Sequence, residues 1–189
     1  MAKGRLIVLT GPSGVGKGTL LRLLMTHHPE LYLSISVTTR SPRPGEVHGQ
    51  HYYFVTRDEF DRMVADDELL EWAEFAGNCY GTPRLPVEYQ IQQGKWVVLE
   101  IELVGARQIE QSFPEAFRVF IMPPSLAELE HRLRKRGHDS EESIAQRLER
   151  ARAEMLAANE FDLRVVNDDL GKALDAIEQA MFPPVGAAS

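Results

Sequence analysis

The sequence lacks several features that would place it in a specialised class of proteins. It has one cysteine, Cys79, so no disulfide can form within the chain and a cysteine-rich metal site is excluded. Acidic residues outnumber basic residues by 28 to 21, and the formal net charge of −7 lacks the positive excess of a nucleic-acid-binding protein. With 14 glycines and 11 prolines, the composition is also unlike a collagenous or low-complexity chain.

Long hydrophobic runs are absent as well. The apolar run nearest the N-terminus, residues 6–9, is far shorter than the roughly 20 residues of a membrane span or the about 7–15 residues of a signal sequence. We therefore expect a cytoplasmic protein that binds neither membranes nor nucleic acid. The 189 residues suit a single domain, which we expect at residues 4–182, followed by a disordered tail at residues 183–189.

Strand and helix patterns alternate along most of the chain. Short apolar runs predict buried strands at residues 6–10, 96–101, 117–121 and 163–166. Helices are predicted at residues 18–28 and 170–181, and two more are predicted to begin at Ser125 with Glu128 and at Asp139 with Glu142, which match capping boxes. This alternation predicts an α/β fold with a parallel sheet.

Residues 34–84 interrupt the alternation. Residues 33–55 mix β-branched, aromatic and polar types around a loop rich in proline and glycine, which predicts short strands. Thr56 and Glu59 form a further capping box, for a helix that ends near Asp66. We interpret residues 34–84 as an insertion from the main sheet.

A candidate phosphate-binding loop lies between the first strand and the first helix. It consists of Gly11, Pro12, Ser13, Gly14, Val15, Gly16, Lys17, Gly18 and Thr19. Its glycines let backbone N–H groups turn toward one point beside a helix N-terminus, and Lys17 supplies a cation for the β- and γ-phosphates of ATP. The alternative is a glycine-rich turn without a ligand, and the lysine at the spacing of the motif argues against it.

One position of this loop departs from the usual motif. A serine or threonine that binds Mg²⁺ normally follows the lysine, whereas here Gly18 follows and Thr19 comes one residue later. Some nucleoside monophosphate kinases carry this form. The direct protein ligand of Mg²⁺ stays open, and the ion can be held mainly by ATP phosphates and water.

A second candidate anion site lies in the insertion. Arg40 and Arg43 stand three residues apart in a stiff loop, so their forked donors can converge on one dianion, and Tyr52 can add a hydroxyl group. Taken alone, Arg40 would be explained more simply as part of a solvated loop.

Taken together, residues 38–55 resemble the signature of the guanylate kinase family. The matching residues are Thr38, Thr39, Arg40, Arg43, Glu46, Gly49, Tyr52, Phe54 and Val55. The resemblance continues through residues 71–73, 77–82, 136–142 and 166–168, and it covers about residues 4–182. It implies phosphoryl transfer from ATP to GMP, giving ADP and GDP for GTP and dGTP synthesis and GMP recycling.

The resemblance also implies a detailed architecture. The fold would be the three-layer sandwich of P-loop NTPases, with a five-stranded parallel core sheet. The core would comprise about residues 4–33, 85–125 and 148–182, the insertion at residues 34–84 would bind GMP, and residues 126–147 would form a helical lid. A monomer is expected.

By position, the resemblance implies two groups of GMP-binding residues. The phosphate group is bound by Arg40, Arg43, Tyr52 and Tyr80. The guanine base is bound by Ser36, Glu71 and Thr82. A carboxylate suits guanine because it can accept both N1–H and the 2-amino group, whereas adenine would leave it unpaired. On local sequence alone, Glu71 could equally be a surface carboxylate and Tyr80 a half-buried phenol.

Two further groups of residues receive roles from the resemblance. Glu100 and Glu102 lie on one face at the end of a strand, where the family usually has two aspartates. We expect Glu100 to contact the GMP ribose or base and Glu102 to approach Mg²⁺ through water; structural pairing with an arginine is the alternative. Arg136 and Arg147 match lid positions that reach the transferred phosphate, and with Lys17 and Arg40 they form the expected catalytic set. Asn167 matches a position near the adenine of ATP.

Two other functions are alternatives to GMP phosphorylation. A related kinase could phosphorylate another acceptor, such as ribose 1,5-bisphosphate, but a sugar phosphate offers no guanine edge for Glu71 and Thr82. A non-catalytic guanylate-kinase-like module could bind a phosphopeptide instead. Such modules usually lack an intact phosphate loop and are joined to other domains, whereas this sequence has Lys17, and from its 189 residues we expect no added domain.

Overall fold

The first strand, β1 (Arg5–Thr10), forms where the sequence has its continuous apolar run, and residues 6–10 are buried. It is the middle strand of a five-stranded sheet with the order β2-β7-β1-β8-β9. The pairs β2–β7 and β8–β9 are both parallel. The parallel α/β fold with a five-stranded core sheet is therefore confirmed. The computed structural model describes residues 4–137 and 140–182, so the expected tail at residues 183–189 lies outside the described residues.

The chain divides into two compact units, one of residues up to 8 and 30–117 and one of residues 9–29 and from 118 onward. In the first unit, the core-sheet strands are most of β1, β2 (Tyr32–Leu33) and β7 (Trp96–Glu100). A second sheet has the order β4-β3-β6-β5. Its strands are β3 (Val37–Thr38), β4 (Tyr53–Phe54), β5 (Leu69–Phe75) and β6 (Asn78–Pro83). The helices are α2 (Arg57–Ala65), α3 (Arg84–Gln92) and α4 (Leu103–Ser112).

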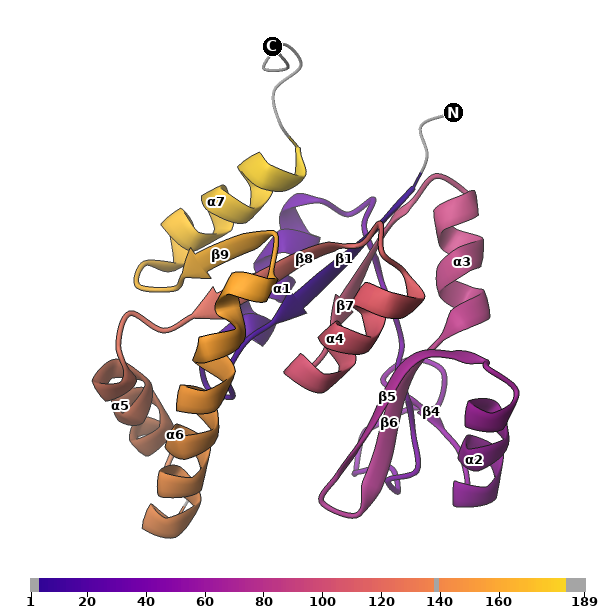
Figure 1. Cartoon of the computed structure of the whole chain (residues 1–189), viewed down its shortest axis with the longest axis horizontal. Coiled ribbons are helices and arrows are strands. Elements are labelled where there is room, and N and C mark those ends of the chain that lie inside the picture. The colour runs from indigo at the N-terminus through magenta and orange to yellow at the C-terminus, as the bar shows by residue number, and fades with distance from the viewer. Residues whose placement is uncertain (1–3, 138–139, 183–189) are drawn as a thin grey trace. The chain divides into compact units, whose positions relative to one another are not determined.

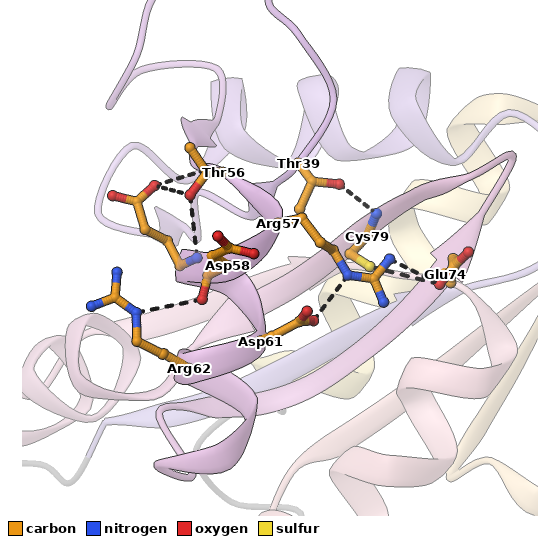
Figure 2. A network of polar contacts seen from close by, with 9 residues as sticks. Thr39, Thr56, Arg57, Asp58, Asp61, Arg62, Glu74 and Cys79 are labelled. Carbon is orange, nitrogen blue, oxygen red and sulfur yellow. Dashed lines mark hydrogen bonds and ion pairs between the residues drawn. The ribbon is translucent and has the colours of Figure 1, made fainter.

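The second sheet matches the short strands that were predicted for the insertion. Its core consists of Val37, Phe60, Leu69 and Cys79. Helix α2 covers this core and begins at the predicted cap, where Thr56 accepts from Glu59 N–H and Glu59 accepts from Thr56 N–H. Figure 2 shows how α2 is tied to the hairpin of β5 and β6: Arg57 bonds Asp61 on its own helix and Glu74 on β5. The single cysteine is thus a buried packing residue.

The second unit contains α1 (Lys17–His27), most of β8 (Phe117–Met122), α5 (Leu126–Arg136), α6 (Glu141–Leu156), a 3₁₀ turn η1 (Ala157–Glu160), β9 (Leu163–Val166) and α7 (Leu170–Met181). Helices α5 and α6 lie side by side (Figure 1). Leu129, Leu133, Ile144 and Ala151 form their shared apolar core. Helix α5 has the predicted cap at Ser125 and ends at Gly137, whose φ of 70° is left-handed.

One predicted helix cap and several predicted boundaries differ from the structure. The cap of α6 is Ser140, whose hydroxyl accepts from Ser143 N–H at 3.2 Å, so the prediction of Asp139 as the cap was wrong. Serine and aspartate cap equally well, and the residue directly before the first helical position takes the role. The strand expected at residues 96–101 ends one residue earlier, at Glu100. The β5–β6 hairpin, α3, α4 and η1 were not predicted.

Candidate active site

The phosphate-binding loop in the second unit has a backbone that depends on glycine. Gly11, Gly14 and Gly16 have φ values of 152°, 89° and 101°, which other residues rarely adopt. Gly16 directly precedes α1, and no side chain caps that helix. The first N–H groups of α1 are therefore suited to bind an anion. The Lys17 ammonium folds back over the loop and donates to the carbonyl oxygens of Gly11 at 2.5 Å and Pro12 at 3.3 Å.

Two side chains from later in the chain hold this loop in place. The buried Asn167 amide donates to the Val15 carbonyl at 2.8 Å. Arg132 on α5 donates to the same carbonyl at 3.5 Å and to the Asn167 carbonyl at 3.0 Å. A Cβ at position 16 would lie 2.5 Å from Asn167 Nδ2, so only glycine fits there. Asn167 supports the phosphate loop directly, and its predicted contact with adenine remains a prediction.

The predicted lid arginines differ in what the structure describes. Arg147 on α6 donates to the Ser13 hydroxyl of the phosphate loop at 3.1 Å. It therefore lies within reach of the loop that was predicted to hold the ATP phosphates. Arg136 is the last residue of α5, and its side chain lies outside what the structure describes.

The phosphate-binding residues of the first unit form a cluster around Arg40. The Arg40 guanidinium pairs with Glu46 at 2.9 Å and lies over the Tyr52 ring, 5.4 Å from its centroid. The Tyr52 and Tyr80 rings meet edge to face, with centroids 6.3 Å apart. The hydrogen bond that Arg40 donates to Glu46 raises the pKa of Arg40, and the same bond lowers the pKa of Glu46. The cluster thus presents a permanent cation beside two phenol groups.

Glu46 also organises the loop that carries Arg43. Its second carboxylate oxygen accepts from the Arg43 backbone N–H at 2.7 Å, while the Arg43 side chain is exposed. Glu46 is one of the residues that match the family signature. The structure shows that it touches both arginines of the predicted site, Arg40 through its side chain and Arg43 through its backbone.

Among the described residues, Glu71 is the one acidic side chain that is buried, with 6% of its surface exposed. It lies on β5, opposite Thr82 on β6, and the Thr82 hydroxyl donates to Glu71 Oε1 at 2.6 Å. Burial raises the pKa of Glu71 to about 7; the Thr82 hydrogen bond opposes this shift, and the charge of Glu102 adds to it. A carboxyl group with this pKa changes its charge near neutral pH and is a candidate for a binding site.

Helix α4 packs on the strand that carries Glu71. Gly105 faces the carboxylate, and an added Cβ would overlap Glu71 Oε2 and lie 3.0 Å from its Cδ. The Gln108 carboxamide accepts from Trp72 N–H at 2.9 Å and donates to the Trp72 carbonyl at 2.7 Å. Ser112 donates to the Leu70 carbonyl at 2.7 Å. The backbone on both sides of Glu71 is therefore bonded to α4.

The remaining predicted residues lie near this carboxylate or on adjoining backbone. Glu100 ends β7 and Glu102 precedes α4, and both are exposed. Glu102 is close enough to affect Glu71 electrostatically, and Glu100 affects Tyr52 in the same way. Ser36 precedes β3, and its carbonyl accepts from Tyr53 N–H at 2.9 Å. Within residues 4–137 and 140–182, no group of three or more His, Cys, Asp or Glu side chains could hold a metal ion.

The structure thus groups the predicted residues into two sets. The first unit brings together Arg40, Tyr52, Tyr80, Glu71, Thr82, Glu100 and Glu102. The second unit brings together the loop of residues 11–19, Asn167 and Arg147. The sequence did not indicate that Arg132 holds the phosphate loop or that Gly105 faces Glu71. No local pattern distinguishes Arg132. A glycine inside a helix costs about 1 kcal/mol relative to alanine, and this cost could have marked Gly105 as a residue with a special role.

Comparisons with known proteins test the resemblance of the chain to the guanylate kinase family. A family model described as guanylate kinase matches residues 3–183. The chain is 65% identical to a guanylate kinase of Nostoc sp., over 95% of this chain and 90% of that protein. It is also 65% identical to a guanylate kinase of Thermosynechococcus vestitus, over 96% of this chain and 95% of that protein.

A solved structure gives the same result. The crystal structure of guanylate kinase from Anaplasma phagocytophilum matches with a TM-score of 0.75 and 34% identity, covering 95% of this chain and 85% of that one. No described helix is long and apolar enough to cross a membrane. The family model covers almost the whole chain, and both relatives are 65% identical to it over at least 95% of its length. The chain therefore belongs to the guanylate kinase family.

Proposed function

We propose that this chain transfers the γ-phosphoryl group of ATP to GMP and releases ADP and GDP. The observation that carries the proposal is the buried Glu71 carboxyl group with its hydrogen bond from Thr82. Burying a carboxylate is costly unless a ligand or partner satisfies its oxygens. Guanine supplies two adjacent donors, N1–H and the 2-amino group, and would satisfy them.

The same arrangement selects against adenine. Adenine N1 is an acceptor, and adenine has no 2-amino group, so AMP would leave the Glu71 carboxylate without donors in a buried site. Thr82 uses its one hydroxyl proton on Glu71, so its contribution to base binding is to orient that carboxylate. Guanine O6 must then accept a hydrogen bond from another group, such as the hydroxyl of Ser36, which is predicted to bind the base.

The Arg40 cluster is suited to the phosphate group of GMP. Arg40 is already held by Glu46 and by the face of Tyr52, so less side-chain freedom is lost when a phosphate binds. Arg43 is exposed on a neighbouring turn, and its fork can add bidentate bonds. Tyr52 and Tyr80 supply hydroxyl donors beside the same cation.

On the second unit, the loop of residues 11–19 is proposed to hold the ATP phosphates. Its backbone N–H groups and Lys17 neutralise charge on the β- and γ-phosphates, and Arg147 adds a cation beside Ser13. Mg²⁺ bound with ATP would neutralise the phosphates further, and the exposed carboxylate of Glu102 suits an ion that keeps its water ligands.

The reaction needs positioning more than acid–base catalysis. An oxygen of the GMP phosphate attacks the γ-phosphorus, the bond from that phosphorus to the β–γ bridging oxygen breaks, and ADP leaves with the electron pair. Because the attacking oxygen is already anionic, no strong general base is required. The residues above serve to bring the two anions together and to stabilise charge on the transferred group. We place this activity in the cytoplasm, in purine nucleotide metabolism, with the chain as a monomer.

The direct test is ADP production with Mg²⁺ and ATP, measured with GMP, dGMP, IMP, AMP or ribose 1,5-bisphosphate as acceptor. We expect fast turnover of GMP and dGMP, weak turnover of IMP and AMP, and none of the sugar phosphate. Use of ribose 1,5-bisphosphate in place of GMP would overturn the assignment of the acceptor. Turnover of no acceptor, together with no thermal stabilisation by ATP, would favour the binding-module alternative.

A further inference from the structure

We propose that α4 is a positioning element for the guanine-binding carboxylate, with Gly105 and Gln108 as its specificity-determining residues. Gly105 leaves the space that the Glu71 carboxylate occupies, and Gln108 fixes the strand from which Glu71 projects. This inference rests on the proposed function, because it assigns the two residues a role in binding the guanine base.

Gly105 sets the position of the carboxylate itself. It is buried inside α4, and its backbone conformation is one that any residue can adopt. The three atoms nearest to an added Cβ all belong to the Glu71 side chain: it would overlap Oε2 and lie 3.0 Å from Cδ. An alanine here would therefore push Glu71 out of its place, while the helix itself would tolerate the change.

Gln108 sets the position of the backbone beside Glu71. Strand β5 lies at the edge of its sheet and pairs with β6 on one side only. On its other side, Gln108 bonds both the N–H and the carbonyl of Trp72. The side-chain amide thus takes the place of a neighbouring strand at one residue.

A third bond completes the arrangement. Ser112 donates to the carbonyl of Leu70, the residue on the other side of Glu71. Gly105, Gln108 and Ser112 are spaced by three and four residues, so they lie on one face of α4. This face bonds both chain neighbours of Glu71 and bounds its side chain.

The consequence concerns the two guanine donors. N1–H and the 2-amino group lie side by side on the base, so a carboxylate must face both at once to accept from both. A small shift of β5 at Glu71 would break this match, and neither β5 nor α4 carries a residue of the ATP loop. The expected signature is a loss of guanine selectivity with ATP use unchanged.

The first test is Gln108→Leu, which keeps the size of the side chain and removes both bonds to Trp72. We expect the KM for GMP to rise by about 10- to 100-fold. The preference for GMP over IMP should fall by at least about tenfold, because IMP lacks the 2-amino group and so depends less on the position of the carboxylate. The KM for ATP should stay within about twofold of wild type. The matched control is Gln111→Leu, an exposed glutamine on the same helix, which should leave all three values unchanged.

The second test is Gly105→Ala, which leaves the Gln108 bonds intact. It should also lower the preference for GMP over IMP, and Gln108→Glu, which keeps an acceptor for Trp72 N–H, should fall between wild type and Gln108→Leu. If one variant fails to fold, as judged by its melting temperature, the others decide the question. An unchanged GMP-to-IMP ratio in the folded variants, or an equal rise in KM for ATP and GMP, would overturn the positioning role.

The wild-type measurement separates this inference from the proposed function. If wild type does not phosphorylate GMP, the proposed function fails and the positioning role fails with it. If wild type prefers GMP and the variants keep that preference, the proposed function stands and only the positioning role is lost.

Discussion

The two units of the molecule bind their proposed ligands with different parts of the chain. The phosphate loop uses backbone: three glycines with positive φ and a helix N-terminus without a side-chain cap. The proposed guanine site uses side chains, above all the buried Glu71 and its partner Thr82. Backbone N–H groups can bind the phosphates that all nucleotides share, whereas distinguishing one base from another requires donors and acceptors in a particular pattern.

The contacts that hold the two sites in place also act on different parts of the chain. Asn167 and Arg132 hold a backbone carbonyl of the phosphate loop, that of Val15. Helix α4 bonds the backbone around Glu71 but also shapes the space for its side chain, through Gly105. The difference suggests that the two sites can be disabled one at a time, and the following predictions test that separation.

The largest effect is expected for Lys17→Ala. Removing this cation should lower kcat by about 10³-fold, because the charge that develops on the transferred group loses a stabilising partner. The Kd for GMP should not change, because Lys17 is assigned to the ATP phosphates. Steady-state kinetics and calorimetric titration with GMP measure the two quantities. A fall in kcat of less than tenfold, in a variant with normal melting temperature, would contradict the role of Lys17.

The next effect is expected for Glu71→Gln. Glutamine replaces one acceptor oxygen with an NH₂ group, which faces a guanine donor, so the KM for GMP should rise by about 10²-fold with the KM for ATP unchanged. The matched control is Glu74→Gln, an exposed glutamate on the same strand, whose ion pair with Arg57 is exposed and contributes little. Equal kinetics for the two variants would argue against guanine binding by Glu71.

The pH dependence of GMP binding should be smaller, at about tenfold. The pKa of Glu71 is raised from 4.5 to about 7, so in the nucleotide-free protein its ionised fraction grows from about 0.1 at pH 6 to about 0.9 at pH 8. Because the ionised form accepts both guanine donors, GMP should bind about tenfold more tightly at pH 8 than at pH 6. Titration of the GMP phosphate itself is removed by comparison with Glu71→Gln, which should lack this part of the pH dependence.

Stability should change with pH in the opposite direction. A raised pKa means that the folded protein holds more protons than the unfolded chain between pH 4.5 and about 7. The contribution of Glu71 to the free energy of unfolding is therefore present below pH 4.5 and is lost as the pH rises through about 7. Comparing denaturant unfolding of wild type and Glu71→Gln across this range isolates the contribution. A difference between the two proteins that does not vary with pH would place the pKa of Glu71 at its ordinary value.

The smallest effect is expected for the helix caps, one in each unit. Thr56→Ala at α2 and Ser140→Ala at α6 each remove a side-chain acceptor, which should cost about 1 kcal/mol of stability. The melting temperature should fall by roughly 2–4 °C in each case, with both KM values unchanged. A large change in either KM would show that the caps affect the binding sites as well as the helices.

Local patterns predicted the parts of the fold that depend on neighbouring residues. The apolar run at residues 6–9, the Thr56–Glu59 box and the glycine loop each specify their structure within a few positions, and each was confirmed. The hairpin of β5 and β6 was missed because its two-residue turn is Ala76-Gly77, with φ of 50° and 75°, where Asn-Gly is the recognisable signal. Helix α4 was missed because it contains Gly105, which disfavours a helix locally.

The residues of the candidate site also differ in how far local sequence could predict them. The phosphate loop is continuous in sequence, so its residues could be named from spacing. The pairing of Glu71 with Thr82, and the approach of Gly105 to Glu71, depend on strand register and helix packing. Resemblance to the family named Glu71 and Thr82, but neither it nor the local sequence indicated that Thr82 gives its proton to Glu71 or that Arg132 supports the phosphate loop.

The bonds from α4 to β5 also have a consequence for association between molecules. The free edge of a sheet displays unpaired N–H and carbonyl groups that can pair with a strand of another chain, which leads to aggregation. At Trp72 both groups are already bonded by Gln108, and at Leu70 the carbonyl is bonded by Ser112. Gln108→Leu should therefore expose a short stretch of pairing edge next to the exposed Trp72 and Phe75 side chains, and its solubility at high protein concentration should fall below that of Gln111→Leu.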